Sequence, residues 1–156
     1  MLTSIKLPGF YFTVLLRLNS KYKFFPFRVL YELSSRKYGF QIRPNTKIGP
    51  GLYIGHFGSI IINENAILGS NINLSPGVVV GQFNRGRKKG VPVLNDKILV
   101  GSNAIIVGGI TIGDNVLIAS GAYVNFDVQP NSMVIGNPGV IKSNLTATQN
   151  YINYTI

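Results

Sequence analysis

Residues 94–124 read "LNDKILVGSNAIIVGGITIGDNVLIASGAYV", and this stretch decides the fold. An aliphatic residue recurs at every sixth position, and a second apolar row precedes it by two positions. The main row comprises Leu94, Val100, Ile106, Ile112, Ile118 and Val124, and the second comprises Ile98, Ala104, Ile110, Val116 and Ala122. A period of six fits neither an α-helix nor a long alternating strand, so it indicates a solenoid.

The same period extends toward the N-terminus as far as Ile42. Each hexapeptide supplies a short strand with its aliphatic residue inward and a turn of small or polar residues, and successive coils pair in parallel. We predict a mainly β fold: a parallel β-helix of hexapeptide repeats with a short N-terminal helical segment and one extruded loop. A β-sandwich with chance periodicity is the weaker alternative, because the phase holds over five consecutive repeats.

The chain divides into three parts on this pattern. Residues 1–39 are predicted to be helical, with one helix over Pro26–Gly39 ending at its glycine and an earlier helix near Gly9–Leu18. Residues 40–142 form the β-helix, with the loop at 82–92, and residues 143–156 form a C-terminal tail.

The repeat is interrupted at two places. Between Ile54 and Ile62 the spacing is eight, and the inserted residues fall within "GHFG", which contains His56, the only histidine of the chain. Between Val80 and Leu94 the chain reads "GQFNRGRKKGVP", which has no hexapeptide signal and is rich in basic residues. Interruptions of a regular solenoid weaken its stacking, so they favour a functional explanation.

Composition and charge restrict the chemistry. The chain has 156 residues, no cysteine and one histidine, which excludes disulfides and disfavours a transition-metal site, so we expect no metal. No signal peptide or membrane-spanning run is recognised, which predicts a cytoplasmic protein, either free or at the inner face of the membrane. The net charge is +10, but the basic residues avoid the central repeat, which disfavours nucleic-acid binding.

Basic and aromatic residues alternate in the N-terminal segment over residues 21–25, "KYKFF". Such a segment is suited to weak peripheral contact with a membrane surface. The alternative, which we favour from the sequence, is that these helices pack across the base of an oligomer.

Three segments together resemble a known family: "GLYIGHFGSIIIN" at 51–63, "RGRKKGVP" at 85–92 and "VIGNPGVIK" at 134–142. With the hexapeptide array, they resemble the left-handed β-helix acyltransferases over residues 40–142. The closest branch is that of serine O-acetyltransferase and its relatives that O-acetylate capsular or exopolysaccharide sugars. The resemblance implies a left-handed prism, a homotrimer, and acetyl-CoA as acyl donor in the groove between neighbouring prisms.

The resemblance also assigns residues to the reaction. His56 occupies the position of the catalytic histidine, and imidazole suits the general base that takes a proton from an attacking hydroxyl. The structural alternative is that His56 fills a turn or packs against Phe57. Gln41 stands where serine acetyltransferases have an aspartate that orients the histidine, and Val91 stands where they have a second histidine. These two replacements disfavour serine as the acceptor.

Positions for acetyl-CoA follow from the same resemblance. The turn positions that line pantetheine fall on Ser102 and Ser120, with Asn103 and Gly121 beside them. The cations available for the cofactor's phosphates are Lys142 and the loop residues Arg85, Lys88 and Lys89. The plainer interpretations are ordinary corner residues and a solvated basic surface.

The sequence therefore favours an acetyl-CoA-dependent O-acetyltransferase that acts by direct attack on the thioester. The expected acceptor is a sugar hydroxyl of a bacterial capsular polysaccharide, exopolysaccharide or precursor, as a small molecule or an oligosaccharide. Serine O-acetyl transfer in cysteine biosynthesis is the enzymatic alternative. A non-catalytic β-solenoid binding protein is the alternative of another class.

Overall fold

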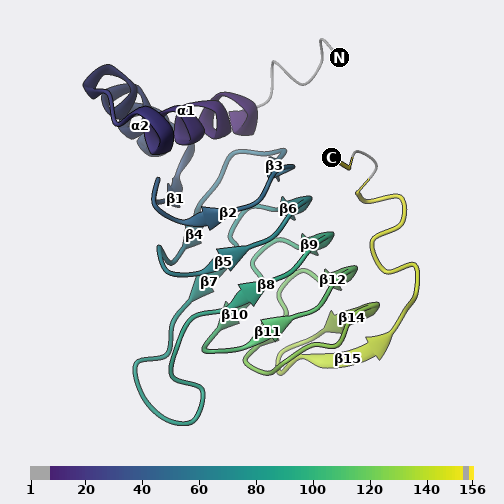
Figure 1. The fold of residues 1–156 in the computed structure, drawn as a ribbon. Coiled ribbons are helices and arrows are strands. Elements are labelled where there is room, and N and C mark those ends of the chain that lie inside the picture. Colours follow the sequence, from purple (N-terminus) through teal and green to yellow (C-terminus); the bar gives the residue numbers. More distant parts are fainter. Residues whose placement is uncertain (1–7, 153–154) are drawn as a thin grey trace.

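The computed structural model describes residues 8–152 and 155–156, beginning with two helices that lie across one end of a prism (Figure 1). Helix α1 spans Pro8–Tyr22 and helix α2 spans Phe25–Tyr38. Helix α2 ends because Gly39 takes a left-handed conformation, with φ of 80°, and its N–H donates to the Ser35 carbonyl. Both predicted helices are confirmed, while residues 1–7 of the predicted segment lie outside the described residues.

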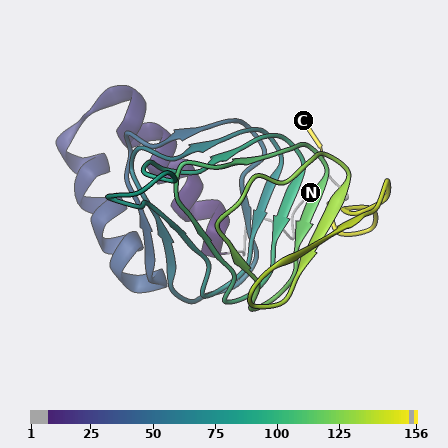
Figure 2. The same ribbon diagram turned by 90° about the horizontal axis from the view of Figure 1, so that it is seen from below.

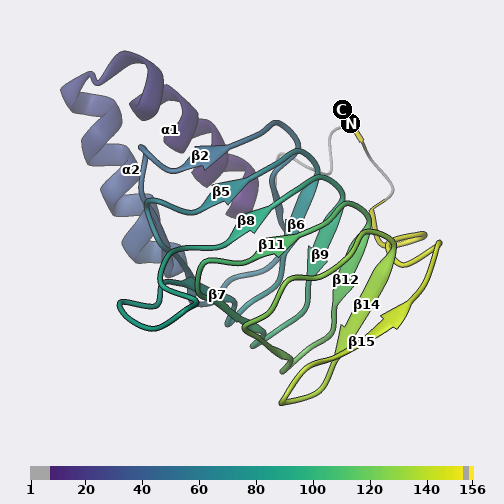
Figure 3. The ribbon, with the colours of Figure 1, turned by 60° about the horizontal axis from the view of Figure 1, so that its bottom comes forward.

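From residue 40 the chain winds into three sheets, which we call A, B and C (Figures 1 and 3). Sheet A contains β1 (Phe40–Ile42), β4 (Ile60–Ile62), β7 (Val79–Gly81), β10 (Ile105–Val107) and β13 (Tyr123–Val124). Sheet B contains β2 (Lys47–Ile48), β5 (Ile67–Leu68), β8 (Val93–Leu94) and β11 (Thr111–Ile112). Sheet C contains β3 (Tyr53–Ile54), β6 (Ile72–Leu74), β9 (Ile98–Val100), β12 (Val116–Ile118), β14 (Ser132–Ile135) and β15 (Val140–Ser143).

Strands of successive coils pair in parallel, and β14 and β15 alone pair antiparallel among the described strands. The register places equivalent hexapeptide positions side by side, for example Ile98 with Ile72 and Val116. Figure 2, seen along the prism, shows the coils superimposed into one three-sided outline, with the helices projecting beyond it.

Both apolar rows fill the interior of the prism. All members of the two rows from Leu94 to Val124 are buried, with Ile98, Ile106 and Ile112 wholly inaccessible to solvent. The residues between the rows face outward or form the corners. The predicted mainly β solenoid is therefore confirmed, since one continuous core runs through every coil.

The corners between sheets form three columns, which we name by the sheets they join. The C–A corner comprises residues 55–59, 75–77, 101–103 and 119–121. The A–B corner includes 63–66, the loop 82–92 and 108–110, and the B–C corner includes 69–71, 95–97 and 113–115. The two interruptions predicted from the sequence thus lie at opposite edges of sheet A.

The helices are fixed to the first coil by close packing and hydrogen bonds. A Cβ atom at Gly9 would come within 2.0 Å of the Ile54 carbonyl oxygen, so only glycine lets α1 approach β3 this closely. The guanidinium of Arg17 donates to the carbonyl oxygens of Ile48 and Gly49, each at 2.5 Å. This packing places the C-terminal end of α2 directly above the first C–A corner.

The C-terminal tail turns back along the prism beside sheet C (Figure 1). Corner asparagines bind it: the Asn115 side chain donates to the Leu145 carbonyl at 2.9 Å and accepts from the Thr148 hydroxyl at 2.7 Å. Higher up, the Ile156 N–H donates to the Asn71 side chain at 2.9 Å. The described residues of the tail are therefore held along this side of the coils at Leu145, Thr148 and Ile156.

Within residues 8–152 and 155–156, neither helix combines the length and the apolar character that crossing a bilayer requires.

Candidate active site

His56 lies at the first C–A corner, between β3 and β4, and its side chain is exposed. This corner has two more residues than the equivalent corners below it. The strands on either side nevertheless stay in register, since Ile61 pairs with Val79. The insertion therefore bulges outward instead of shifting the strands. Among the described residues, the imidazole has no hydrogen-bond partner, so it is free to meet a ligand.

Glycine makes the bulge possible at its end. Gly58 has φ of 134°, and a Cβ atom there would lie 2.9 Å from the Pro76 Cβ in the coil below. Its N–H donates to the Tyr38 carbonyl at 3.2 Å, which ties the bulge to the end of α2. A side chain at this position would push the bulge that carries His56 away from Pro76 and from the end of α2.

Two backbone donors accompany the imidazole. The N–H groups of His56 and Phe57 donate to no acceptor in the described part of the chain; at the corners below, those of Gly77, Asn103 and Gly121 are paired, while those of Ser102 and Ser120 are not. Unpaired amides beside a general base are suited to stabilise an oxyanion at a reacting carbonyl. The bulge thus presents an acceptor for a proton and donors for a developing negative charge.

The residues predicted to line pantetheine lie in the same column as His56. Ladder hydrogen bonds link the corners downward: Gly77 N–H to Ser59 O at 2.6 Å, Asn103 N–H to Pro76 O at 2.9 Å, and Gly121 N–H to Ser102 O at 2.8 Å. Ser120 and Gly121 share the lowest of these corners. The structure therefore places all four predicted corner residues, Ser102, Asn103, Ser120 and Gly121, below the histidine along one edge.

Lys142 lies on β15, at the lower end of sheet C, where it pairs with Met133 of β14. Its side chain is exposed. Lys142 is thus at the same end of the prism as the lowest C–A corner, although on a face instead of the edge.

The basic loop leaves the prism at the A–B corner, across sheet A from His56. Its base is closed by a pair of hydrogen bonds between Phe83 and Gly90, each 3.0 Å, and Gly109 N–H donates to the Lys88 carbonyl at 2.8 Å. Arg85 and Lys89 are exposed at this loop. Within one chain, the structure does not bring the loop cations together with His56 and the pantetheine column.

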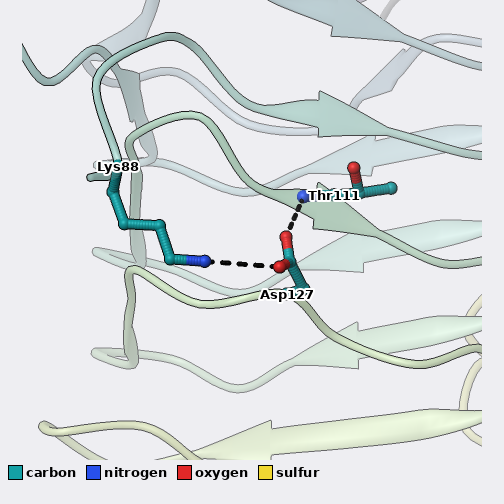
Figure 4. Close-up of polar contacts among 3 residues, drawn as sticks. All are labelled: Lys88, Thr111 and Asp127. Carbon is teal, nitrogen blue, oxygen red and sulfur yellow. Dashed lines mark hydrogen bonds and ion pairs between the residues drawn. The ribbon is translucent and has the colours of Figure 1, made fainter.

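Lys88 is partly neutralised by a partner that the sequence analysis did not identify. Its ammonium lies 3.3 Å from Asp127 Oδ2, and Asp127 Oδ1 accepts the Thr111 N–H at 2.8 Å (Figure 4). The Thr111 hydrogen bond, followed by the one from Lys88, lowers the pKa of the Asp127 carboxyl below its ordinary value. The ion pair anchors the loop to the lower coils and leaves Arg85, Arg87 and Lys89 without an ion-pair partner among the described residues.

We expect Asp127→Asn to destabilise the protein by less than about 1 kcal/mol near neutral pH, because the ion pair is exposed. Because the pKa of this carboxyl is lower in the folded protein, the carboxylate stabilises the fold at pH values above the pKa of the unfolded chain, about 3.9. The stabilisation is lost as the pH falls through the lower pKa of the folded protein. The difference between variant and wild type should therefore disappear in strong acid. Denaturant unfolding at neutral and strongly acidic pH measures it, and an equal loss at both would contradict the assignment.

Gln41 lies on the outer face of β1 and lines a polar pocket of about 420 Å³ with Glu32, Arg43 and Glu64. This pocket lies toward the A–B edge, and no hydrogen bond joins Gln41 to His56. The orienting role of Gln41 therefore stays a prediction, without a contact within one chain to support it.

From the sequence, Phe57 is identified only as a residue that His56 packs against, and Tyr53 and Tyr38 are not identified. Tyr53 and Phe57 are 48% and 66% exposed, and the Phe57 ring stacks on Tyr38 with centroids 5.6 Å apart. The signal was present, since Phe57 lies in the same "GHFG" segment as the histidine. Its partner on α2 was not apparent, because that contact exists only in the folded chain.

In the part of the chain that the structure describes, no three His, Cys, Asp or Glu side chains lie close enough together to bind a metal ion.

Comparisons with known proteins give one consistent result. No family model matches the sequence. The serine acetyltransferase of Synechococcus elongatus is 36% identical over 112 residues, covering 72% of this chain and 46% of the relative. That of Helicobacter pylori is 32% identical over 120 residues, covering 77% and 70% respectively.

A solved structure agrees with these relatives. Serine acetyltransferase from Brucella abortus, in complex with coenzyme A, superposes with a TM-score of 0.74 at 26% identity, over 89% of this chain and 57% of that one. The chain thus spans about half to two thirds of the length of the relatives it matches.

Proposed function

Because the chain belongs to the serine acetyltransferase family, whose members share the left-handed β-helix, we propose that it is an acetyl-CoA-dependent O-acetyltransferase. The observation that carries the proposal is the outward bulge at the first C–A corner. It presents the unpaired His56 imidazole and two unpaired amides at the upper end of a column of small corner residues.

The proposed reaction is a direct transfer in which His56 is the general base. The imidazole takes the proton of the acceptor hydroxyl as its oxygen attacks the thioester carbonyl. The N–H groups of His56 and Phe57 stabilise the negative charge on the carbonyl oxygen. The C–S bond then breaks, and the leaving thiolate takes the proton from the imidazolium. The products are an acetyl ester and the free thiol of coenzyme A, and no acyl-enzyme forms.

Acetyl-CoA fits the C–A column below His56. Its acetyl end would lie at the bulge, and the extended pantetheine would run past Ser102 and Ser120, where small side chains leave the backbone open. Lys142 lies near the lower end for the phosphates. Coenzyme A is bound by the Brucella abortus relative, which supports this donor for the present chain.

Two acceptors are proposed, and the comparisons favour one of them. The relatives are named serine acetyltransferases, so they support L-serine better than the sugar hydroxyl predicted from the sequence. The sugar remains a second proposal, because Gln41 and Val91 replace the aspartate and histidine that the resemblance associates with serine acetyltransferases.

The test is release of free thiol from acetyl-CoA with L-serine or with methyl glycosides of glucose, galactose, mannose and N-acetylglucosamine. Acceptor-dependent release by wild type supports acetyl transfer and identifies the acceptor class. Absence of release with every acceptor would contradict the proposed activity.

We propose that three copies assemble with the outer faces of their A sheets turned toward a common axis. The outward residues Ile61, Ile105 and Tyr123 of sheet A form an apolar stripe, and the two chain interruptions border it. In a cyclic assembly the A–B edge of one copy meets the C–A edge of the next, which brings a basic loop to a neighbouring His56. Light scattering should give three times the 17.0 kDa chain mass, and a monomeric active enzyme would contradict this.

The helical end of the molecule supports a weaker proposal, contact with an anionic membrane surface. Phe24 and Phe25, at the start of α2, are 57% and 74% exposed, and Lys21 and Lys23 precede them. Exposed aromatics beside cations suit the interface of an anionic bilayer. We expect wild type, but not Phe24→Ser/Phe25→Ser, to co-sediment with phosphatidylglycerol vesicles. Failure of wild type to co-sediment would contradict the proposal.

A further inference from the structure

The insertion at the first C–A corner exposes an aromatic ring beside His56. Phe57 is 66% exposed, although its ring is held in place on one side. It stacks on Tyr38 with an interplanar angle of 29°, and Tyr38 in turn contacts Phe40 with centroids 5.8 Å apart. The free face of Phe57 is therefore a fixed apolar surface, not a loosely attached side chain.

A second exposed aromatic residue, Tyr53, precedes the histidine by three positions. The Tyr53 ring lies over the backbone at Gly55, where a Cβ atom would be 3.0 Å from the phenol oxygen and 3.1 Å from a ring carbon. In the sequence, the proposed general base thus lies between two residues with exposed rings, Tyr53 and Phe57, within five consecutive residues.

We propose that the stacked Phe57–Tyr38 pair is the platform on which the acceptor binds, and that this acceptor is a pyranose sugar. The inference rests on the proposed acetyl-transfer function and specifies its substrate class. A pyranose has an apolar face of C–H groups, which packs on an aromatic ring and removes that surface from water. A sugar stacked on Phe57 would present an equatorial hydroxyl toward the neighbouring imidazole.

Other occupants fit this surface less well. L-serine has one methylene group and two charges, so it has no apolar face of comparable size to cover the ring. The adenine of acetyl-CoA is at the far end of the cofactor from the thioester. The C–A column leads the adenine away from His56. The Ser120 corner lies three coils below the His56 corner, which is about 14 Å at about 4.8 Å per coil.

One charged side chain lies close to the platform. Lys37 is the cation beside it, and its ammonium lies 5.4 Å from the centre of the Tyr38 ring. Among the described residues, no carboxylate hydrogen-bonds to the residues of the bulge.

The test compares Phe57→Ala with Phe57→Tyr, which keeps a ring, and with Phe25→Ala as a matched control on an exposed ring far from the site. We expect Phe57→Ala to raise the KM for the accepted methyl glycoside about tenfold and to leave the KM for acetyl-CoA unchanged. Phe57→Tyr and Phe25→Ala should stay within about threefold of wild type. Light scattering on each variant shows whether the assembly is intact.

Several results would overturn the proposal while leaving acetyl transfer intact. These are higher kcat/KM for L-serine than for all four glycosides, or an unchanged glycoside KM in Phe57→Ala. A raised KM for acetyl-CoA would instead place the cofactor on the ring, and a loss of assembly mass would place a second copy there. If no acceptor is turned over, saturation-transfer NMR with the four glycosides decides: binding lost in Phe57→Ala supports the platform, and no binding to wild type overturns it.

Discussion

We expect His56→Ala to lower kcat for acetyl transfer by about 10²- to 10⁴-fold, the range that a positioned general base contributes. The reason is that the imidazole is the only group of its kind in the chain and stands unpaired at the bulge. The KM for acetyl-CoA should change little, because the cofactor column lies in the corners below and does not depend on this side chain. Steady-state kinetics of thiol release measure both quantities.

Two further variants make this result specific. His56→Asn keeps a polar side chain of moderate size but cannot accept the hydroxyl proton at neutral pH, so it should be as inactive as His56→Ala. Lys47→Ala, on the exposed face of sheet B, should retain wild-type kcat. Wild-type activity in His56→Ala would show that the bulge does not contain the base.

The second large effect concerns stability. We expect Leu68→Ala to lower the free energy of unfolding by about 2–5 kcal/mol, because it leaves a cavity in the stacked core. Leu68 is 2% exposed and lies in the main apolar row on β5. Its strand neighbour Ile67 is 38% exposed on the outer face of sheet B. Guanidinium unfolding of all variants at one protein concentration measures the difference.

Ile67→Ala is the matched control, since it removes a comparable side chain from the same strand. We expect it to change stability by only about 0.5 kcal/mol, as surface substitutions usually do. Sheet B lies outside the proposed contact between copies, so assembly should not disturb the comparison. Equal losses for both variants would show that the two residues do not face the inside and the outside of a prism.

The hexapeptide rows made the coil architecture predictable, because inward residues of a solenoid recur wherever a coil passes. Leu94 and Ile106 could be assigned to the core from their phase alone, and the structure confirms both. The interruptions were predictable for the same reason: an insertion breaks a period whose length is known. His56 and the loop at 82–92 could therefore be singled out from the sequence alone.

The contacts made across that framework could not be predicted. Lys88 and Asp127 are 39 residues apart, and nothing in the period indicates that the loop folds down onto the last coil. Phe57 meets Tyr38 only because α2 ends above the first C–A corner. Gln41 lines a pocket with Arg43 that the period does not indicate, and its orienting role stays a prediction.

The measurement that tests the central claim most directly is transfer of an isotope-labelled acetyl group from acetyl-CoA to an acceptor, detected by mass spectrometry of the product. Wild type and His56→Asn would each be incubated with L-serine and the four methyl glycosides. We expect one O-acetylated acceptor to appear with wild type and to be absent with the variant. Labelled product formed equally by both proteins, or by neither, would contradict the assignment of acetyl transfer to the bulge at His56.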